Sequence, residues 1–398
     1  MEFLLDLKSH RQLILSLLIL SPAFAAGYIG LLQVFGRMYA DSFVYVGWAE
    51  FFAGANPGYL TEVSTLPFDA SAVIISLRPV VPMLAGLLTP LLGPRPAFGV
   101  VNTVFWVLGA LSCYYIGRKI SSIRLGVVCA VFYGTSIPMF AYGAAVLSDC
   151  AAYCFMGLAL FLTLQKKSKL LGRRRIFGEG VLMAIGSFAN PAGLASLSYI
   201  TIVRCWVRKN ILPFVAGLAV LLVPVLLFAT IAGWLAKLTQ FSVYVLDLRF
   251  AGIRSGPPFV DALLWTFNLS ALYLIWPYVL VHWFSLGYQL LFLCAVIAGV
   301  IYVPRKKDLL LYVPFLLVYE FVAHATIERY LFIVWPVFIP VLMFGAGKLA
   351  SIITYVVDKL VRGRIRIDPL LFVALYIDVQ AWVNLISLYP AVFNILRL

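Results

Sequence analysis

Charged side chains are scarce in this sequence. Asp, Glu, Lys and Arg together make up 12% of its 398 residues, whereas an ordinary soluble domain carries about 25%. Hydrophobic residues make up 63%, and a water-soluble fold of this length could not hide so much apolar surface. The shortage of charge therefore excludes an ordinary soluble protein and predicts an integral membrane protein.

Histidine and paired cysteine are also rare, which removes the usual signs of a metal centre. The chain has 3 His and 6 Cys, and the cysteines show no paired metal-binding spacing. Cys150 and Cys154 are one helical turn apart, but a metal there needs further ligands that the sequence does not offer. His282 and His324 stand alone beside predicted helix ends, where a structural role is favoured. No nucleotide-binding loop, internal repeat or soluble domain is evident.

Long uncharged runs are abundant instead. Ile211 to Gly233 has no charged residue, and about 20 apolar residues span the hydrocarbon core of a bilayer. The sequence predicts an all-α, polytopic transmembrane protein with about eleven spans, forming a single domain over residues 1–398 without a soluble C-terminal domain. The expected spans are residues 12–34, 98–117, 125–141, 150–165, a pair on either side of Asn190-Pro191, 211–233, 284–303, 309–325, 331–357 and one that begins at Pro369.

Two long segments are predicted on the outer side. Residues 35–97 contain two short apolar pieces, Phe43 to Ala53 and Pro79 to Leu92, which we expect to be helices lying along the interface. The second outer segment is 234–282. The chain is on the outer side at residue 233 and on the cytoplasmic side at the basic loop after residue 304. An odd number of crossings must therefore lie between them, either one or three, and one is preferred.

The positive charges indicate the orientation. The net charge is +14, and most Lys and Arg fall in short loops that share one side, as expected of cytoplasmic loops. We therefore expect a multi-pass protein of the cell membrane with a cytoplasmic N-terminus and a retained first span. The basic excess then serves orientation and contact with membrane lipids, not nucleic-acid binding. The loops are residues 8–11, 118–124, 166–175, 204–209, 305–307 and 359–366.

Two acids and two arginines are predicted at the same outer depth. Asp41 follows the first span, Arg78 falls near the end of the first outer segment, and Asp149 and Arg329 stand at the outer mouths of later spans. Ionisable groups at a membrane boundary are functional candidates because leaving them unpaired is costly. A carboxylate can deprotonate a hydroxyl, and guanidinium groups bind phosphate. Group transfer from a lipid-linked phosphate and a purely structural set of salt bridges both fit these residues.

Several motifs follow one another in a characteristic order. Gly36 to Tyr45 places Asp41 soon after the first span with an aromatic residue beyond it, and Leu77-Arg78-Pro79-Val80-Val81-Pro82 leads into an apolar helix. Ala145 to Asp149 opens a returning helix, and Ile327-Glu328-Arg329-Tyr330 precedes Pro336. This order resembles the GT-C membrane glycosyltransferases, which include protein O-mannosyltransferases and bacterial lipid A aminoarabinose transferases. The resemblance is densest between residues 36 and 165.

The resemblance implies an inverting glycosyltransferase whose active site faces outward. Its donor would be a polyprenyl- or dolichyl-phosphate sugar, and its acceptor a hydroxyl of a glycan, lipid or protein. Asp41 would act as general base or position the acceptor, and Asp149 would be the second acid; these two would also hold a divalent cation if one binds. The implied substrate-binding residues are Arg78, Arg329, Tyr45 and Tyr330. The chain departs from the family in lacking Asp-x-Asp at residues 39–41.

Other functions remain open on the sequence alone. Glu320, inside a predicted span, is a candidate for binding donor or acceptor. A secondary transporter or lipid-linked-sugar flippase is the main alternative, although transporters usually show internal repeats and charges near the bilayer midplane. A third hypothesis is a degenerate relative of these enzymes that has no catalytic activity and only assembles with partners.

Overall fold

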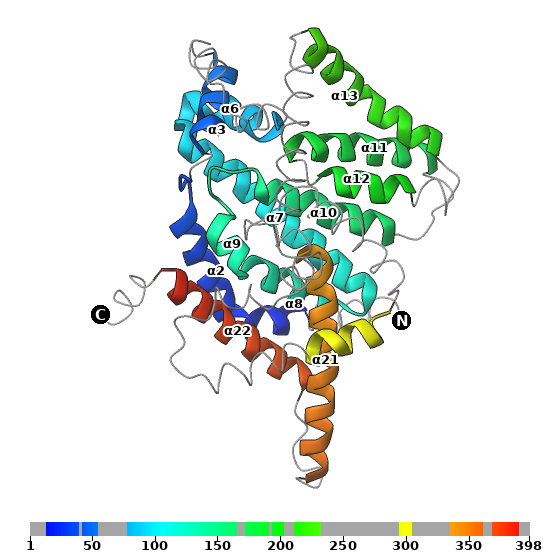
Figure 1. Cartoon of the computed structure of the whole chain (residues 1–398). Coiled ribbons are helices and arrows are strands. Elements are labelled where there is room, and N and C mark those ends of the chain that lie inside the picture. The colour runs from blue at the N-terminus through cyan, green and yellow to red at the C-terminus, as the bar shows by residue number, and fades with distance from the viewer. Residues whose placement is uncertain are drawn as a thin grey trace, which may run out of the picture.

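The computed structural model describes most of the chain between residues 13 and 389. The described residues are 13–39, 42–54, 78–164, 172–190, 193–202, 211–231, 294–304, 335–360 and 368–389. Every regular element in these ranges is an α-helix, and they contain no β-strand (Figure 1). The predicted all-α fold is confirmed for this part of the chain.

The helices agree closely with the predicted apolar segments. The two short pieces of the first outer segment are helical, as are both sides of the turn at Asn190. A short helix at Leu13–Ile19 precedes α2, and another covers residues 294–302. The predicted span at 309–325 lies outside the described residues. The labelled helices are α2 (Ser21–Val34), α3 (Ser42–Phe52), α6 (Val80–Leu92), α7 (Pro94–Ile120), α8 (Ile123–Gly134), α9 (Ile137–Tyr142), α10 (Asp149–Leu164), α11 (Gly172–Ala189), α12 (Gly193–Ile202), α13 (Ile211–Ile231), α21 (Trp335–Leu360) and α22 (Pro369–Leu388).

Two helices are long and apolar enough to cross a bilayer, judged by length and composition within the described ranges. They are Pro94–Ile120 and Phe338–Leu360, and a third crossing is counted if the bent pair before residue 35 is one span. Several shorter helices, such as Ile211–Val223 and Leu371–Ile386, are apolar but span fewer residues. The helices have membrane-protein character, and the figure of about eleven spans stays a prediction.

Two predicted spans are interrupted. The first, at 12–34, bends by 63° between Leu13–Ile19 and Ser21–Val34, and the third, at 125–141, divides into α8 and α9. Proline stands in the first turn of α2 and of α9. Proline has no N–H to donate to the preceding turn, and its ring clashes with that turn's carbonyl, so a helix starts there more readily than it continues. The spans predicted at residues 12–34 and 125–141 are each divided into two helices at these points.

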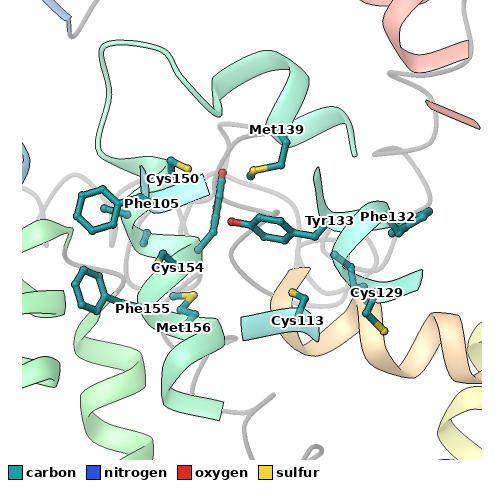
Figure 2. Packing of buried hydrophobic residues seen from close by; sticks show 14 of the residues in the cluster. Phe105, Cys113, Cys129, Phe132, Tyr133, Met139, Cys150, Cys154, Phe155 and Met156 are labelled. Atoms are coloured by element: carbon teal, nitrogen blue, oxygen red, sulfur yellow. The ribbon is translucent and has the colours of Figure 1, made fainter. Parts of the chain in front are cut away.

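The buried core forms where α7, α8 and α10 pack together. Tyr133 of α8 is fully buried and points its ring toward α10, whose Cys150 and Cys154 lie along the facing side (Figure 2). A Cβ added to Gly109 of α7 would collide with the Tyr133 hydroxyl, so the absence of a side chain there lets the two helices approach. Within the described ranges, no three His, Cys, Asp or Glu residues are arranged to hold a metal ion.

Helix α11 packs against α13 through two glycines. A Cβ on Gly180 would collide with the carbonyl oxygen of Phe214, and a Cβ on Gly217 would collide with that of Phe177. Small residues let helix backbones approach closely where there is no water to drive association. This contact holds α11, and with it the turn at Asn190.

Helix α7 separates two ends of the bundle. It has 27 residues, which is about 40 Å at 1.5 Å per residue. Asn102 in its first third donates hydrogen bonds to the segment before α10, whereas Arg118 and Lys119 lie in its last turn. We call these regions the Asn102 end and the Arg118 end.

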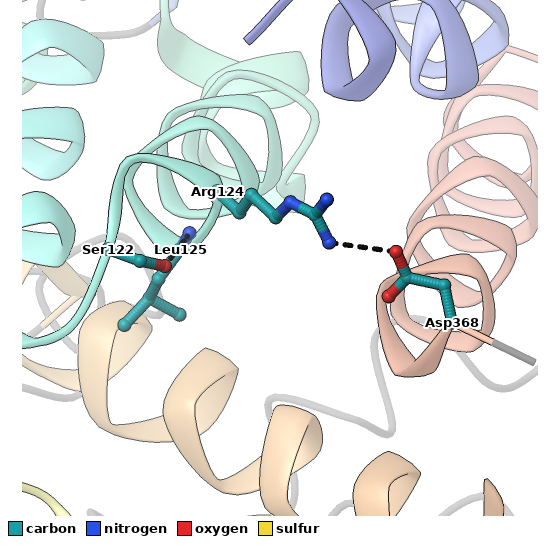
Figure 3. A network of polar contacts seen from close by, with 4 residues as sticks. All are labelled: Ser122, Arg124, Leu125 and Asp368. Atoms are coloured by element: carbon teal, nitrogen blue, oxygen red, sulfur yellow. Dashed lines mark hydrogen bonds and ion pairs between the residues drawn. The ribbon is translucent and has the colours of Figure 1, made fainter. Parts of the chain in front are cut away.

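An exposed ion pair lies just beyond the Arg118 end of α7. Arg124, in the first turn of α8, contacts Asp368 at 2.7 Å, directly before α22 (Figure 3). At its other end α22 is followed by Tyr389, whose hydroxyl donates to the carbonyl oxygen of Phe140 at 2.8 Å. Arg37 donates to the same hydroxyl at 3.3 Å. These contacts tie both ends of α22 to the rest of the bundle.

Candidate functional site

Three of the predicted site residues lie within the described ranges. They are Tyr45 on α3, Arg78 directly before α6, and Asp149, the first residue of α10. The four others, Asp41, Glu320, Arg329 and Tyr330, lie outside the described residues.

The structure brings Arg78, Tyr45 and the start of α10 together. A terminal nitrogen of Arg78 donates to the Tyr45 hydroxyl at 2.9 Å, across 33 positions of the sequence. The Tyr45 hydroxyl in turn lies 2.8 Å from the Ser148 hydroxyl, across 103 positions. All of these groups are buried, with Arg78 8% and Asp149 5% exposed. An arginine and a carboxylate removed from solvent to this degree are candidates for a functional role.

Burial keeps Tyr45 protonated. It raises the pKa of the Tyr45 phenol above its ordinary value; the Arg78 guanidinium opposes that effect, and the Asp149 carboxylate adds to it. The negative charge of Asp149 therefore acts on this hydroxyl. Tyr45 serves as a neutral hydrogen-bonding group at physiological pH and not as an acid or base.

Two further members of the network were not predicted from the sequence. The Asn190 side-chain amide donates to the Ser148 hydroxyl at 2.9 Å. Asn190 is 1% exposed and directly follows α11, and Ser148 is fully buried. Their positions could have indicated them, because Ser148 directly precedes Asp149 and Asn190 lies in a predicted outer turn. They were missed because the sequence argument selected charged residues, and both of these are neutral.

The segment before α10 is held from two sides. The Asn102 amide donates to the carbonyl oxygens of Ala145 at 2.6 Å and Leu147 at 2.8 Å. From the other side, the Val146 N–H donates to the carbonyl oxygen of Arg37 at 2.9 Å. These bonds fix the backbone that presents Ser148 and Asp149.

The described residues on either side of Asp41 contact the same segment. Ser42 donates from its hydroxyl to the carbonyl oxygen of Val146 at 2.7 Å. Tyr39 donates to the carbonyl oxygen of Ala141, and burial raises the pKa of Tyr39 to about 12, with Arg37 opposing the rise. The chain on both sides of the predicted base therefore packs against the approach to Asp149.

The predicted divalent cation stays a prediction. Its proposed ligands are Asp41 and Asp149, and Asp41 lies outside the described residues. Asp149 is buried, and the described part of the chain holds no group of three or more His, Cys, Asp or Glu residues arranged for a metal ion.

A second buried carboxylate lies away from this network. Asp378 on α22 is 9% exposed and accepts a hydrogen bond at 3.0 Å from the N–H of Ala23, in the first turn of α2. That N–H has no partner within its own helix because α2 begins at the bend. Asp378 was not predicted as a site residue, although a charge within the last predicted span is a signal that could have found it.

Comparison with known proteins does not identify the chain. No protein-family model matches it, and no curated protein sequence matches it significantly.

Proposed function

We propose that this protein is a GT-C-like membrane glycosyltransferase that uses a polyprenyl- or dolichyl-phosphate sugar on the extracytoplasmic face. The observation that carries the proposal is the buried contact between Arg78 and Tyr45 at the start of α10, beside Asp149. These residues come from three separate motifs whose order resembles that family. Residues of one active site must lie close together in the fold, as these do. Separate structural salt bridges would not need to meet at one place.

The chemistry is a single displacement at the anomeric carbon. An acceptor hydroxyl oxygen attacks that carbon while the bond from the carbon to the phosphate oxygen breaks, which inverts the configuration. Asp41 takes the hydroxyl proton, and Asp149 is the second acid of the site. Arg78 and Arg329 neutralise the departing lipid phosphate, since guanidinium groups match phosphate geometry. Tyr45, Tyr330 and Glu320 complete the substrate contacts.

The distribution of charge supports an outward-facing site. Arg118 and Lys119 end α7 far from Asn102. Arg173, Arg174 and Arg175 begin α11, whose other end leads to Asn190 beside Ser148. Basic residues thus concentrate away from the buried network, as expected if they mark the cytoplasmic side of a multi-pass protein of the cell membrane.

The test is sugar transfer by the purified full-length protein from a panel of radiolabelled polyprenyl-phosphate sugars. We expect Asp41→Asn to lower turnover by about 100-fold or more, because general base catalysis typically contributes that much. Asp368→Asn is the matched control, since it makes the same change beside the exposed Arg124 and should leave turnover intact. Equal turnover in wild type and Asp41→Asn would remove Asp41 from the mechanism.

A secondary transporter or lipid-linked-sugar flippase is the second candidate, and one observation favours it. Transporters often point the N-terminus of a broken membrane helix at an anionic group of the substrate. The 63° bend before α2 provides such a helix N-terminus, and the Asp378 carboxylate occupies it through the Ala23 N–H. The test is movement of labelled lipid-linked sugar across proteoliposome membranes. Movement that needs Asp378 and leaves the sugar on its lipid would favour the transporter over the enzyme.

A further inference from the structure

Arg37 is an exposed arginine whose side chain lies against two tyrosine rings. Its guanidinium carbon is 5.5 Å from the centre of the Tyr39 ring and 5.8 Å from the centre of the Tyr389 ring. One terminal nitrogen donates to the Tyr389 hydroxyl at 3.3 Å. Attraction between the cation and the two rings holds the guanidinium in one orientation. Its other nitrogen donors form no hydrogen bond with the described residues, so a ligand from outside can reach them.

A second exposed arginine lies next to the same segment. Arg95 is in the first turn of α7, and a Cβ added to Gly36 would lie 3.2 Å from the Arg95 carbonyl oxygen and 3.6 Å from the Arg95 Cβ. The backbone on either side of residue 36 therefore contacts the start of α7. In the described part of the chain neither arginine forms an ion pair with an acid. If this end of the bundle faces outward, two unpaired arginines depart from the usual concentration of basic residues on the cytoplasmic side.

Exposed apolar side chains lead up to both arginines. On α2 these are Leu32, which is 55% exposed, and Phe35, which follows the helix and is 40% exposed. On α6 they are Leu87 and Leu91, four positions apart on one helix face and 69% and 83% exposed. Helix α6 contains no charged residue. Apolar faces of this kind contact acyl chains in a membrane, so the arginines lie where the lipid-facing surface ends.

We propose that Arg37 and Arg95 bind the phosphate headgroup of an anionic phospholipid whose acyl chains lie on the exposed faces of α2 and α6. A guanidinium group binds phosphate through two N–H donors at once. Charge selects an anionic lipid over a zwitterionic one, because two arginines repel the ammonium group that a zwitterionic headgroup also carries. The inference goes beyond sugar transfer and does not depend on it.

The lipid would lie beside the candidate functional site. The carbonyl oxygen of Arg37 accepts a hydrogen bond from the Val146 N–H at 2.9 Å, and the Tyr389 hydroxyl donates to the carbonyl oxygen of Phe140 at 2.8 Å. A headgroup bound at Arg37 would therefore stabilise the contacts among the end of α2, the end of α22 and the segment that leads to α10. We expect an anionic lipid to raise the melting temperature for this reason.

The experiment measures binding of phosphatidylglycerol and of phosphatidylcholine to the purified full-length protein by native mass spectrometry. We expect wild type to prefer phosphatidylglycerol by about tenfold or more, as two basic residues near an anionic headgroup would give. Arg37→Lys keeps the charge but loses the planar group that stacks on the rings and binds phosphate at two points. It should lose about fivefold of that preference. Arg118→Lys is the matched control, because it makes the same change at an exposed arginine in the last turn of α7, and it should bind as wild type does.

Each outcome either supports or overturns the inference. Equal binding of the two lipids to wild type overturns it. A preference that changes equally in Arg37→Lys and Arg118→Lys, or in neither, also overturns it, because net charge alone then attracts the lipid. An Arg37-dependent preference for polyprenyl phosphate without one for phosphatidylglycerol would assign the arginines to the substrate lipid and overturn it as well.

The melting temperature in phosphatidylcholine nanodiscs shows whether each variant is folded. If Arg37→Lys does not fold, Tyr389→Phe decides, since it keeps every charge and removes the hydroxyl that holds the guanidinium. This variant must then lose part of the preference for phosphatidylglycerol. Its control is Tyr355→Phe, because Tyr355 is an exposed tyrosine on α21, and this change should leave the preference intact. Equal preferences in these two variants would overturn the inference.

Discussion

Arginine and aspartate occur at both ends of the bundle, but their surroundings differ. Beyond the Arg118 end, the Arg124 and Asp368 side chains are 32% and 50% exposed and form an ion pair at 2.7 Å. At the Asn102 end, Arg78 is 8% and Asp149 5% exposed, and Arg78 donates to the Tyr45 hydroxyl, which contacts Ser148 beside Asp149. The same residue types thus form a solvent-facing contact in one place and a buried network in the other.

The difference shows why residue type alone is a poor guide to a site. An exposed ion pair gains little because water and salt screen it. A buried charge is retained only where the protein supplies partners, and losing one partner is costly. Tyr45 is such a partner for Arg78, and Ser148 contacts Tyr45 in turn. These buried contacts make the Asn102 end the better candidate for chemistry.

The largest effect is expected for Asn102→Leu, which removes the support at the Asn102 end. The substitution keeps the side-chain size but leaves the carbonyl oxygens of Ala145 and Leu147 without their buried donor. Each unsatisfied group costs about 1–3 kcal/mol, so we expect the free energy of unfolding to fall by roughly 3 kcal/mol. Denaturant titration in detergent measures it.

The control for this change is Gln33→Leu, because Gln33 is an exposed amide on α2. It should alter stability little. If Asn102→Leu were as stable as wild type, the segment before α10 would not depend on α7, and the contrast between the two ends would weaken.

A smaller effect is expected for Gly217→Ala, which tests how α11 is positioned. The added methyl group would meet the carbonyl oxygen of Phe177 and push α11 away from α13. Overpacking of this kind typically costs about 1–3 kcal/mol, and we expect about 2. Since α11 leads to Asn190, which donates to Ser148 next to Asp149, sugar transfer should fall as well. Thermal melting and the sugar-transfer assay provide the two measurements.

Gly178→Ala is the matched control, because a Cβ at Gly178 would have no atom within 4 Å. Alanine is the better helix former, so this variant should be as stable as wild type or slightly more stable. Equal losses in both variants would mean that helix propensity, and not the contact with α13, decides the outcome.

The helices were predictable because apolar runs of bilayer length are visible in composition alone. Helix α13 begins where its run begins, at Ile211. The breaks were not predicted, because the chain on both sides of Pro22 and Pro138 is equally apolar and hydropathy does not register a missing N–H. These helix boundaries depend on single proline residues, which an average of hydropathy over many residues does not reveal.

The site was partly predictable for a similar reason. Tyr45, Arg78 and Asp149 came from charge scarcity and motif order, and their structural convergence depends on contacts between distant segments. Asn190 and Ser148 are 42 positions apart, and Ala23 and Asp378 are 355 apart. A single sequence has no pattern that pairs neutral or lone polar residues over such distances, so these contacts required the structure.

A further prediction concerns Tyr39, which lies at the Asn102 end but is only partly buried. Its pKa is raised from 10.0 to about 12 by burial, so its neutral form contributes stability that is complete below pH 10 and is lost as pH rises through 12. Tyr39→Phe loses the hydrogen bond to Ala141, which is worth about 1 kcal/mol. The stability difference between wild type and variant should therefore shrink between pH 10 and 12.

That comparison is made by melting both proteins at several pH values in the same detergent. Tyr28→Phe is a suitable control, since Tyr28 is exposed on α2. A difference between wild type and Tyr39→Phe that stays constant from pH 9 to 12 would show that Tyr39 does not titrate in this range, or that its burial does not favour the neutral phenol.

The smallest effect is expected from the ion pair beyond the Arg118 end. A double-mutant cycle of Arg124→Gln and Asp368→Asn should give a coupling of about 0.2–1 kcal/mol, as for other exposed pairs. The coupling should decrease as ionic strength rises, because salt screens exposed charges over about 10 Å at 0.1 M. A coupling above about 2 kcal/mol, or one insensitive to salt, would mean that this end is as well shielded as the Asn102 end. Burial would then no longer distinguish the candidate site, and the case for Arg78 and Asp149 would rest on motif order alone.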